Sequence, residues 1–407
     1  MNTLEKLLEK LCPEGVEFVK LKTVVKSIKT GLNPRKNFKL NDDNSKNYYV
    51  TVKEFTSGKI KFSNKTDRIN DTALEIIQNR SKLELNDVLF SGIGTIGKVA
   101  IVNIPVNNWN CSESVFLFKA IESIIIPKFL MYNLLSDFIK NQYGSQVVGS
   151  TLKGVRMGTL LELNIPLPPL AIQEKIVEIL DKFTQLETEL ETELEARKAQ
   201  YQFYRNQLLA FENKQVEWKS LGEIGKVSMC KRIMKNETTS TGDIPFYKIG
   251  TFGKIPNAFI KKEVYENYKS KYSFPKVGTI LISASGTIGR TVIYDGKPAY
   301  FQDSNIVWVD NDESIVTNQF LNQFYKIIKW ETDTGGVISR LYNDNIKKAK
   351  IPVPSMEEQN RIVKILDHFD DLVNDISSGL PAEIKARRQQ YEYYRAKLLT
   401  FKVMENN

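Results

Sequence analysis

The sequence is poor in the residues that most often build cross-links and catalytic centres. It has three cysteines and one histidine among 407 residues. Cys12, Cys111 and Cys230 are odd in number, far apart and free of CxxC spacing, so we expect reduced, packed thiols and neither a disulfide framework nor a thiolate metal site. The lone His368 excludes histidine-dependent triads and multi-histidine metal sites, and its position predicts a helix surface.

Long apolar runs are also missing. No run approaches the ~18 residues that a membrane-spanning helix needs. The first residues mix Glu and Lys at helical spacing, unlike a signal peptide. We therefore expect a cytoplasmic protein with no membrane partner, and a hydrophobic content of 42% allows two or three domains with real cores.

Catalytic motifs are absent or incomplete. Residues 92–99 satisfy GxGxxG and most of a P-loop, but Val99 stands where a P-loop has its Mg²⁺-binding hydroxyl, and the residues that follow read as a strand. The kinase HRD and DFG triplets and the tetrapeptides of adenine methyltransferases do not occur. Glu383 and Lys385 form a nuclease-like ExK without its Pro-Asp partner, which we interpret as a chance match. No catalytic or metal-binding residue is predicted, and we expect a chain that is not an enzyme.

What the sequence does have is a tandem repeat. Residues 197–209 return as 387–399, and residues 165–181 return as 351–367, so that Gln173 matches Gln359. Residues 16–18 and 94–98 similarly match 216–218 and 286–290. Residues 22–84 and 222–276 share little. Each half therefore joins a variable globular unit to a similar helical one.

The Gly-Thr-Ile-Gly segment that both copies share decides whether the glycine-rich motif is a nucleotide-binding loop or a structural turn. The second copy, at residues 286–289, keeps these glycines but loses the first glycine of the fingerprint. We therefore predict a structural turn between two strands, rather than a nucleotide loop.

The helical segments follow a heptad pattern. Apolar residues from Ile172 to Phe211 step by four and three, with Arg197 filling one polar step, apart from two successive steps of four at 186, 190 and 194, which form a stutter. The second copy should break near Gly379 and Pro381, because proline inside a helix removes a donor. Two such segments most simply pack antiparallel against each other. Taken alone, the pattern would favour a dimerisation coiled coil or the core helices of one bundle, but neither of these needs the flanking pair of related and diverged units.

Charge is distributed unevenly. The whole chain carries +9, yet acidic side chains outnumber basic ones in both helical segments, so the globular units hold a larger positive excess. This excess is the footprint expected of a nucleic-acid binder. The glutamates at 187, 189, 191, 193 and 195 would repel phosphate, and we expect them to face solvent or a protein partner.

Residues 261–276 interleave lysines with aromatics. We expect Tyr265, Tyr268 and Tyr272 to face the core of a short helix, with the lysines outside and able to reach phosphates. The candidate DNA-binding residues in the variable units are Lys53, Lys59, Lys61, Lys248, Lys261, Lys262, Lys269 and Lys271.

With these repeated segments, the sequence resembles the specificity subunit of type I restriction-modification systems over essentially the whole chain. The most specific marks are residues 164–169 with Gln173, 200–201, 204–205 and 208–209, and residues 351–354 with Gln359, 390–391, 394–395 and 398–399. Residues 11–18 also look like the usual opening of that family. Ser355, where the first copy has Pro169, is a departure that puts little in doubt.

The resemblance implies a fold and partners. It implies an α+β fold, in which two α/β-mixed target-recognition domains are joined by two long antiparallel helices that form a coiled coil in a pseudo-twofold tandem repeat. The expected divisions are a recognition domain at 1–165, a central helix at 166–212, a second recognition domain at 213–351 and a helical spacer at 352–407. Each domain would read half of a bipartite, asymmetric site in double-stranded DNA. The implied seam and partner-docking residues are Tyr201, Tyr204, Arg205, Leu208, Tyr391, Tyr394, Arg395 and Leu398.

The resemblance also implies that two methyltransferase subunits dock on the helices and that restriction subunits join through the complex. S-adenosylmethionine, ATP and Mg²⁺ would belong to those partners, and this chain would bind no cofactor. Two other classes stay open from the residues alone. A non-catalytic coiled-coil scaffold would bind proteins and show no steep salt dependence on DNA, and an NTP-using enzyme would show nucleotide-dependent heat in calorimetry.

Overall fold

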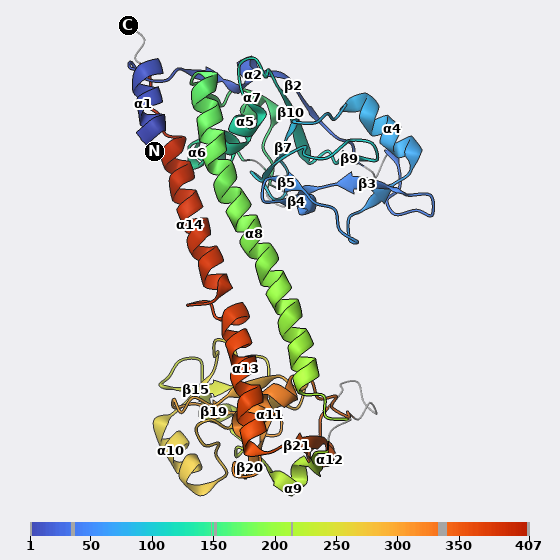
Figure 1. Ribbon diagram of the computed structural model, residues 1–407, viewed down its shortest axis with the longest axis vertical. Helices are drawn as coiled ribbons and strands as arrows, with labels where there is room; N and C mark the ends of the chain where they lie inside the picture. Colours follow the sequence, from blue (N-terminus) through green and yellow to red (C-terminus); the bar gives the residue numbers. More distant parts are fainter. Residues whose placement is uncertain are drawn as a thin grey trace. The chain divides into compact units, whose positions relative to one another are not determined.

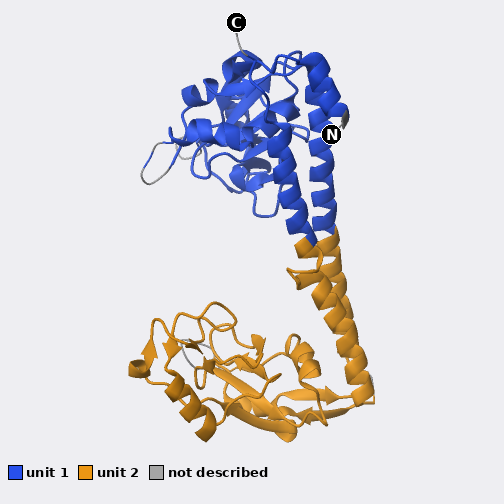
Figure 2. Cartoon of the chain, turned by 90° about the vertical axis from the view of Figure 1, so that its left-hand side faces the viewer, with its two compact units in different colours: residues 1–192, 383–407 blue, residues 193–382 orange. Residues whose placement is uncertain are grey.

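The computed structural model describes residues 2–33, 37–147, 149, 153–212, 215–332 and 340–404. The chain forms two compact units, shown in different colours in Figure 2. Unit 1 comprises residues 1–192 and 383–407, and unit 2 comprises residues 193–382. The division falls within the long helix α8 (Leu170–Leu208), so each unit holds part of α8 together with one diverged globular domain.

Unit 1 is a mixed α/β unit with its own core. Besides the first part of α8 it contains α1 (Asn2–Leu11), β1 (Phe18–Lys20), α2 (Leu21–Val24), β2 (Val25–Thr30), β3 (Asn47–Val50), η1 (Val52–Glu54), β4 (Phe55–Thr56), β5 (Lys59–Ile60), β6 (Arg68–Ile69), α4 (Asp71–Arg80), β7 (Val88–Ser91), β8 (Val99–Ile101), β9 (Trp109–Cys111), β10 (Val115–Ala120), α5 (Pro127–Leu134), α6 (Asp137–Gly144), α7 (Met157–Leu161), β11 (Asn164–Pro166) and α14 (Leu380–Leu398, which enters unit 1 at Glu383). Its main sheet has the order β2-β10-β7-β8-β5-β4, and a second sheet has the order β6-β3-β9.

Unit 2 repeats part of this plan. Besides the rest of α8 it contains β12 (Glu217–Ser220), α9 (Leu221–Ile224), β13 (Gly225–Met229), η2 (Lys235–Glu237), β14 (Thr238–Thr239), β15 (Ile244–Tyr247), β16 (Phe259–Ile260), α10 (Lys262–Lys271), β17 (Ile280–Ser283), β18 (Thr291–Ile293), β19 (Tyr300–Phe301), β20 (Ile306–Asn311), α11 (Asn318–Tyr325), α12 (Asn343–Lys348), β21 (Lys350–Val353) and α13 (Met356–Asn374). The sheet order β13-β20-β17-β18 matches β2-β10-β7-β8 of unit 1. In the second sheet, β16-β15-β19 matches β6-β3-β9, with one antiparallel and one parallel pairing in each, and β14 is added at the edge.

The repeated sequence marks close each domain in the same way. In unit 1, β1 pairs antiparallel with β11, and Phe18 lies opposite Pro166. In unit 2, β12 pairs antiparallel with β21, and Trp218 lies opposite Pro352. The chain thus enters and leaves each domain through one two-stranded pairing, which the matched residues specify.

The Gly-Thr-Ile-Gly segments are turns between antiparallel strands, as predicted. They join β7 to β8 in unit 1 and β17 to β18 in unit 2. The glycines at both ends of each segment have positive φ, between 66° and 85°, which an L side chain rarely adopts. The turn opens no helix, so it lacks the helix N-terminus on which a P-loop or dinucleotide fold binds phosphate.

The two ends of the chain meet in unit 1. The Val16 amide donates to Lys402 O at 2.8 Å, and the Met404 amide donates to Val16 O at 3.0 Å. Gly15, with φ of 116°, allows this approach, because a Cβ there would lie 2.8 Å from Lys402 O.

The helices confirm the predicted long segment and the predicted break. The first copy is one helix of 39 residues, α8, and the second copy is split into α13, which ends at Asn374, and α14, which begins at Leu380 (Figure 1). Pro381 lies in the first turn of α14, where its missing N–H has no intrahelical partner to lose. A Cβ on Gly379 would meet Asp371 O at 2.4 Å, so the break needs glycine.

One part of the predicted seam is wrong. Leu186 was expected in the seam but is 45% exposed, whereas Leu180 and Glu187 are 0% and 9% exposed. The buried residues 180 and 187 and the half-buried residues 184 and 191 form a stripe that keeps regular steps of four and three through the stutter. A search for apolar residues could not identify this stripe, because Thr184, Glu187 and Glu191 are polar.

Candidate nucleic-acid interface and helix junctions

The candidate lysines of unit 1 lie on one short segment. Lys53 is in η1, Lys59 is in β5 and Lys61 follows β5, and all three side chains are exposed. The Glu54 carboxylate holds this segment by accepting from the Thr51 amide at 2.8 Å. The structure therefore brings these three cations to one hairpin.

The candidate lysines of unit 2 lie around α10. Lys248 follows β15, Lys261 precedes α10, and Lys262, Lys269 and Lys271 belong to the helix; all five side chains are exposed. Lys269 Nζ lies 5.2 Å from the centre of the Tyr265 ring, within the range of a cation–π contact. Within the described ranges, none of the eight candidate lysines forms an ion pair, so their charges face solvent.

The aromatic residues of this segment follow the prediction in part. Tyr265 is buried and Tyr268 is half-buried, donating to Glu237 Oε1 at 3.0 Å. Tyr272 is 45% exposed, against expectation. The helix ends at Lys271, so the backbone of Tyr272 is extended and no longer follows the helical face.

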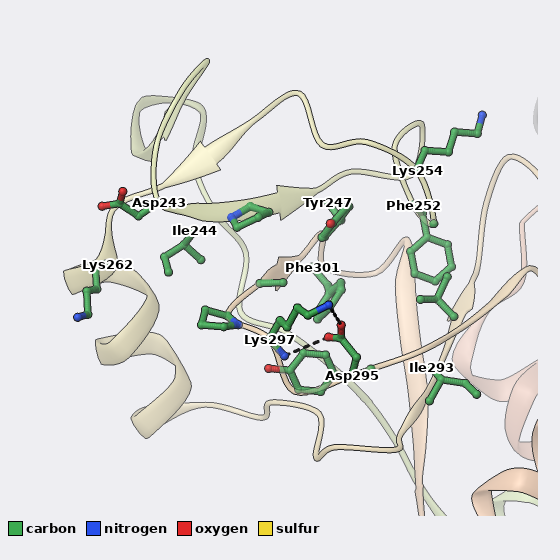
Figure 3. A pocket seen from close by; sticks show the side chains of 16 residues that line it. Asp243, Ile244, Tyr247, Phe252, Lys254, Lys262, Ile293, Asp295, Lys297 and Phe301 are labelled. Atoms are coloured by element: carbon green, nitrogen blue, oxygen red, sulfur yellow. Dashed lines mark hydrogen bonds and ion pairs between the residues drawn. The ribbon is translucent and has the colours of Figure 1, made fainter. Parts of the chain in front are cut away.

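A hollow of about 770 Å³ lies beside α10 in unit 2 (Figure 3). Tyr247 and Phe301 stack with ring centroids 5.9 Å apart and contribute to its wall. Lys254, Lys262 and Lys297 line it as well, and Lys297 pairs with Asp295 at 3.0 Å. Hydrogen bonds from Lys297 lower the pKa of Asp295.

This combination of aromatic and cationic groups suits bases and phosphates. Of the candidate lysines, Lys262 lines the hollow. Sequence reasoning missed Lys254 and Lys297. The available signal in the sequence was that each follows a turn glycine, Gly253 or Gly296.

The predicted seam tyrosines meet phenylalanines at equivalent places. In unit 1, the ring centroid of Phe183 in α8 lies 5.3 Å from that of Tyr394 and 6.4 Å from that of Tyr391 in α14. In unit 2, Phe369 of α13 lies 5.5 Å from Tyr204 and 6.2 Å from Tyr201 of α8.

The arginines and leucines of the repeated marks are also placed alike. Arg395 lies over Tyr391 at 5.1 Å, and Arg205 lies over Tyr201 at 5.2 Å. Leu398 is buried and Leu208 half-buried in the cores of their units. The structure thus brings the predicted seam residues together within each unit, and burial raises the pKa of Tyr201 to about 12.

A buried glutamine fixes each helix to its domain. In unit 1, Gln173 accepts from the Ile126 amide at 2.9 Å and donates to Ile124 O and Pro168 O at 3.1 and 2.8 Å. In unit 2, Gln359 accepts from the Thr317 amide at 2.9 Å and donates to Ile315 O and Pro354 O at 2.9 and 3.0 Å. Both side chains are 0% exposed. The repeat therefore preserves three hydrogen bonds, which explains why these glutamines align.

The glutamates of α8 do not all face solvent, and this corrects the expectation. Arg388 of α14 pairs with Glu187 at 2.6 Å and with Glu191 at 3.2 Å. These contacts raise the pKa of Arg388. Glu193 pairs with Arg197 within α8. Position 187 is in the seam, where a carboxylate is tolerated because α14 supplies its counter-charge.

The remaining residues that the sequence analysis singled out are a histidine, an ExK pair and three cysteines. His368 is an exposed residue of α13, as expected, and Glu383 and Lys385 lie on α14. Cys111 and Cys230 are buried and free, and Cys12 is half-buried. Over the described part of the chain, no group of three or more His, Cys, Asp or Glu side chains could hold a metal ion, and no helix is long and apolar enough to span a membrane.

Fold and site together define a tandem-repeat binding protein, with two α+β domains of dissimilar surface fixed to helices by the same contacts. The family profile described as the type I restriction modification DNA specificity domain matches residues 13–197 and again residues 213–386. The chain therefore belongs to this family and carries the domain twice.

Relatives agree with this assignment. A protein of Haemophilus influenzae, named as a candidate type I restriction enzyme specificity subunit, is 57% identical over 252 residues, covering 60% of this chain and 65% of the relative. The specificity subunit of the Escherichia coli type I enzyme EcoR124I/EcoR124II is 37% identical over 251 residues, covering 58% of this chain and 61% of that relative. The chain thus matches less than two thirds of the length of each of these relatives.

A solved structure shows the same fold. It comes from work described as the structural basis of complex assembly and conformational transition of the type I R-M system. The superposition has a TM-score of 0.58 at 19% identity and covers 95% of this chain and 97% of that one. The predicted fold class, with two mixed domains joined by long helices in a tandem repeat, is confirmed.

Proposed function

We propose that this chain is the DNA specificity subunit of a type I restriction-modification complex and that each unit reads one half of a bipartite, asymmetric target. One observation carries the proposal. The contacts that hold each domain to its helices, which we call the frame, are the same in both units, whereas the segments that form the rest of each domain differ. The glutamine anchors, the closing strand pairs and the aromatic junctions match residue for residue. Residues 22–84 and 222–276 share little.

Equal frames and different domain surfaces suit a protein that makes two kinds of contact with DNA. Contacts to the DNA backbone position a protein, whereas contacts to base edges specify sequence. Two domains with dissimilar exposed side chains should therefore read dissimilar half-sites. The unpaired lysines around η1 and α10 are the candidate phosphate contacts, and their loss should weaken binding at all sequences alike.

The repeated helical surface supports two copies of one protein partner. Phe203 of α8 is 62% exposed, and its repeat equivalent, Tyr393 of α14, is 63% exposed. Each ring packs edge-on against the adjacent tyrosine, at 5.6 Å from Tyr204 and 5.3 Å from Tyr394. Exposed aromatics are typical anchors of protein interfaces. We assign these positions to docking of two methyltransferase subunits, with restriction subunits joining through the complex.

The cofactors then belong to the partners. The glycine segment at residues 94–97 joins two strands, and Val99 lies in β8. Nothing in this turn supplies the helix N-terminus and hydroxyl of a nucleotide loop. S-adenosylmethionine, ATP and Mg²⁺ are accordingly assigned to the methyltransferase and restriction subunits.

The test is methylation sequencing of genomic DNA from cells that express this chain with its partner subunits. We expect a motif of two different half-sites separated by a non-specific spacer. A palindromic motif would contradict the reading of one half-site by each unit. A salt titration on random duplex checks DNA binding itself, because the affinity of a protein scaffold for DNA would not fall steeply with salt.

A further inference from the structure

The Gly-Thr-Ile-Gly turn is a feature of both recognition domains that the proposed function has not used. Its geometry is the same in the two units. A buried serine organises each turn: Ser91 Oγ accepts from the Lys98 amide at 2.8 Å, and Ser283 Oγ accepts from the Arg290 amide at 2.9 Å. The amide of the last glycine donates to the carbonyl of that serine at 2.9 Å in both units. Two diverged domains thus keep one small loop. Positive φ requires its glycines, and its isoleucine packs against the core in both units, which leaves the threonine as the matched residue that the fold does not require.

The tip of each turn is directed to solvent. Gly94 and Thr95 are exposed in unit 1, and Gly286 and Thr287 are exposed in unit 2. Positive φ explains the matched glycines, but core packing does not explain the matched and exposed Thr95 and Thr287. The residue after each turn is a cation, Lys98 or Arg290.

In unit 2 the turn borders a hollow of about 190 Å³. Arg290 and Lys254 line it together with the Ser283 and Thr287 side chains, and its described lining contains no carboxylate. Arg290 Nη1 donates to Phe252 O at 3.1 Å, and Nη2 lies 3.5 Å from Thr287 Oγ1. A guanidinium has five N–H donors, so further donors are available to a ligand. Two cations with hydroxyl groups and no counter-charge fit an anion with several oxygens.

Unit 1 presents a similar cationic edge. Lys98 is exposed and forms no ion pair among the described residues, and the hollow that it lines is also lined by three other cations and by Glu187 and Glu392. The neighbouring Lys153 is also exposed, and its carbonyl accepts from the Gly94 amide at 2.8 Å. The turn and the cation that follows it therefore recur in both units, although the domains around them differ.

We propose that each Gly-Thr-Ile-Gly turn, with Lys98 in unit 1 and with Arg290 and Lys254 in unit 2, binds a phosphate of the DNA backbone. The inference rests on the proposed function and deepens it. A contact made through the same turn and a following cation in two domains that read different bases carries no sequence information. Backbone phosphates are the part of DNA that is the same at every site, and phosphate contacts fix the register of a protein on the duplex. The turns therefore position both domains, and the diverged segments read the bases.

The test measures the salt dependence of DNA binding by the full chain, using fluorescence anisotropy with a random-sequence duplex. The variants are Lys98→Gln, Arg290→Gln and the double variant. The matched control is Lys364→Gln, which removes the same charge from an exposed position of α13. We expect the slope of log affinity against log salt to become shallower by about 1 in each single variant and by about 2 in the double variant, and to stay unchanged in the control.

Arg290→Gln also removes a hydrogen bond to the backbone, so Lys254→Gln serves as a second variant that leaves this bond intact. It too should make the slope shallower. Methylation sequencing with the partner subunits should give the wild-type motif for all four variants.

The outcomes are distinguishable. No salt-dependent DNA binding by the wild type would overturn the proposed function itself. Wild-type binding with unchanged slopes in Lys98→Gln and Lys254→Gln would overturn only the phosphate assignment. A changed base in one half-site would identify the turn as a base reader, and loss of methyltransferase association at unchanged slope would identify it as a protein contact. Each of these two results overturns the inference.

Discussion

The helix junctions of the two units have the same aromatic layer and differ in the next one. In unit 1, α8 meets α14 through the buried Glu187, which pairs with Arg388. In unit 2, α13 has Val373 at the repeat-equivalent position, and this side chain is 2% exposed in an apolar core. An apolar layer stabilises without specifying register, whereas a buried ion pair is satisfied in only a few registers. The difference indicates that register is selected in the part of α8 that contains Glu187.

The largest effect should come from the contacts that the two units share. Replacing Gln173 or Gln359 by Leu leaves one backbone amide and two carbonyls without partners in a buried place. Each orphan group costs ~1–3 kcal/mol, so each variant should lose about 3 kcal/mol or more of stability in its own unit. Hydrogen exchange over α5 and α8, and separately over α11 and α13, measures this, with the exposed Gln202→Leu as control. Loss in only one of the two units would show that the frames are not equivalent.

A smaller effect is expected where the junctions differ. Arg388→Ala leaves Glu187 nearly buried without a counter-charge, and we expect a loss of about 1–3 kcal/mol, below the ~3–5 kcal/mol of a fully buried pair because Arg388 is 54% exposed. Combining Glu187→Val with Arg388→Met replaces the ion pair by an apolar layer and should recover most of the loss.

Thermal denaturation provides the measurement for the Arg388 variants. The matched control is Arg387→Ala, since Arg387 makes an exposed pair with Glu383 on the same helix, worth under ~0.5 kcal/mol. Equal losses at positions 387 and 388 would remove the argument that the buried pair selects register.

Deleting residues 188–191 should change specificity with little loss of stability. The deletion brings Glu195 to the position of Glu191, so Arg388 again has two carboxylates four residues apart, and the buried stripe continues in heptad order. Four helical residues span ~6 Å and DNA rises ~3.4 Å per base pair, so the spacer between half-sites should shorten by about one or two base pairs.

Methylation sequencing of cells carrying wild type or deletion with the same partners measures the spacer. An unchanged spacer would show that α8 does not set the distance between half-sites. Altered half-site bases would show that the helix also positions side chains within the recognition domains.

The smallest effect concerns the thiols of the two domain cores. Burial raises the pKa of Cys111 and of Cys230 to about 12. A raised folded-state pKa keeps the thiol protonated, so its stabilising contribution is present below the unfolded pKa near 8.5 and is lost as pH rises towards 12. At pH 8 a thiol reagent should therefore modify Cys12 first and reach the other two only on unfolding. Rapid native modification of Cys111 in unit 1 but not Cys230 in unit 2 would mean that the two domain cores open differently.

Much of the fold could be predicted because the sequence itself contains a tandem repeat. The long helix, its broken counterpart, the glycine turn and the surface position of His368 follow from spacing, proline and duplication. The seam at Leu186 and the outward face of Tyr272 could not be predicted. In the first case a charged residue occupies a core position, and in the second the helix ends one residue too early. The lysines of the large hollow were partly missed for a similar reason, since Lys254 and Lys297 come from loops that only folding brings beside Tyr247.

The sequence by itself determined that this protein is a tandem repeat with equal helical parts and unequal domains, because periodicity and duplication are properties of residue order. Only the tertiary structure decided which matched residues are anchors and which charges are neutralised. Gln173 and Gln359 bind backbone groups far away in sequence, and Glu187 finds Arg388 about 200 positions later. Such contacts depend on where the chain returns in space, and burial then determines which of them the fold cannot lose.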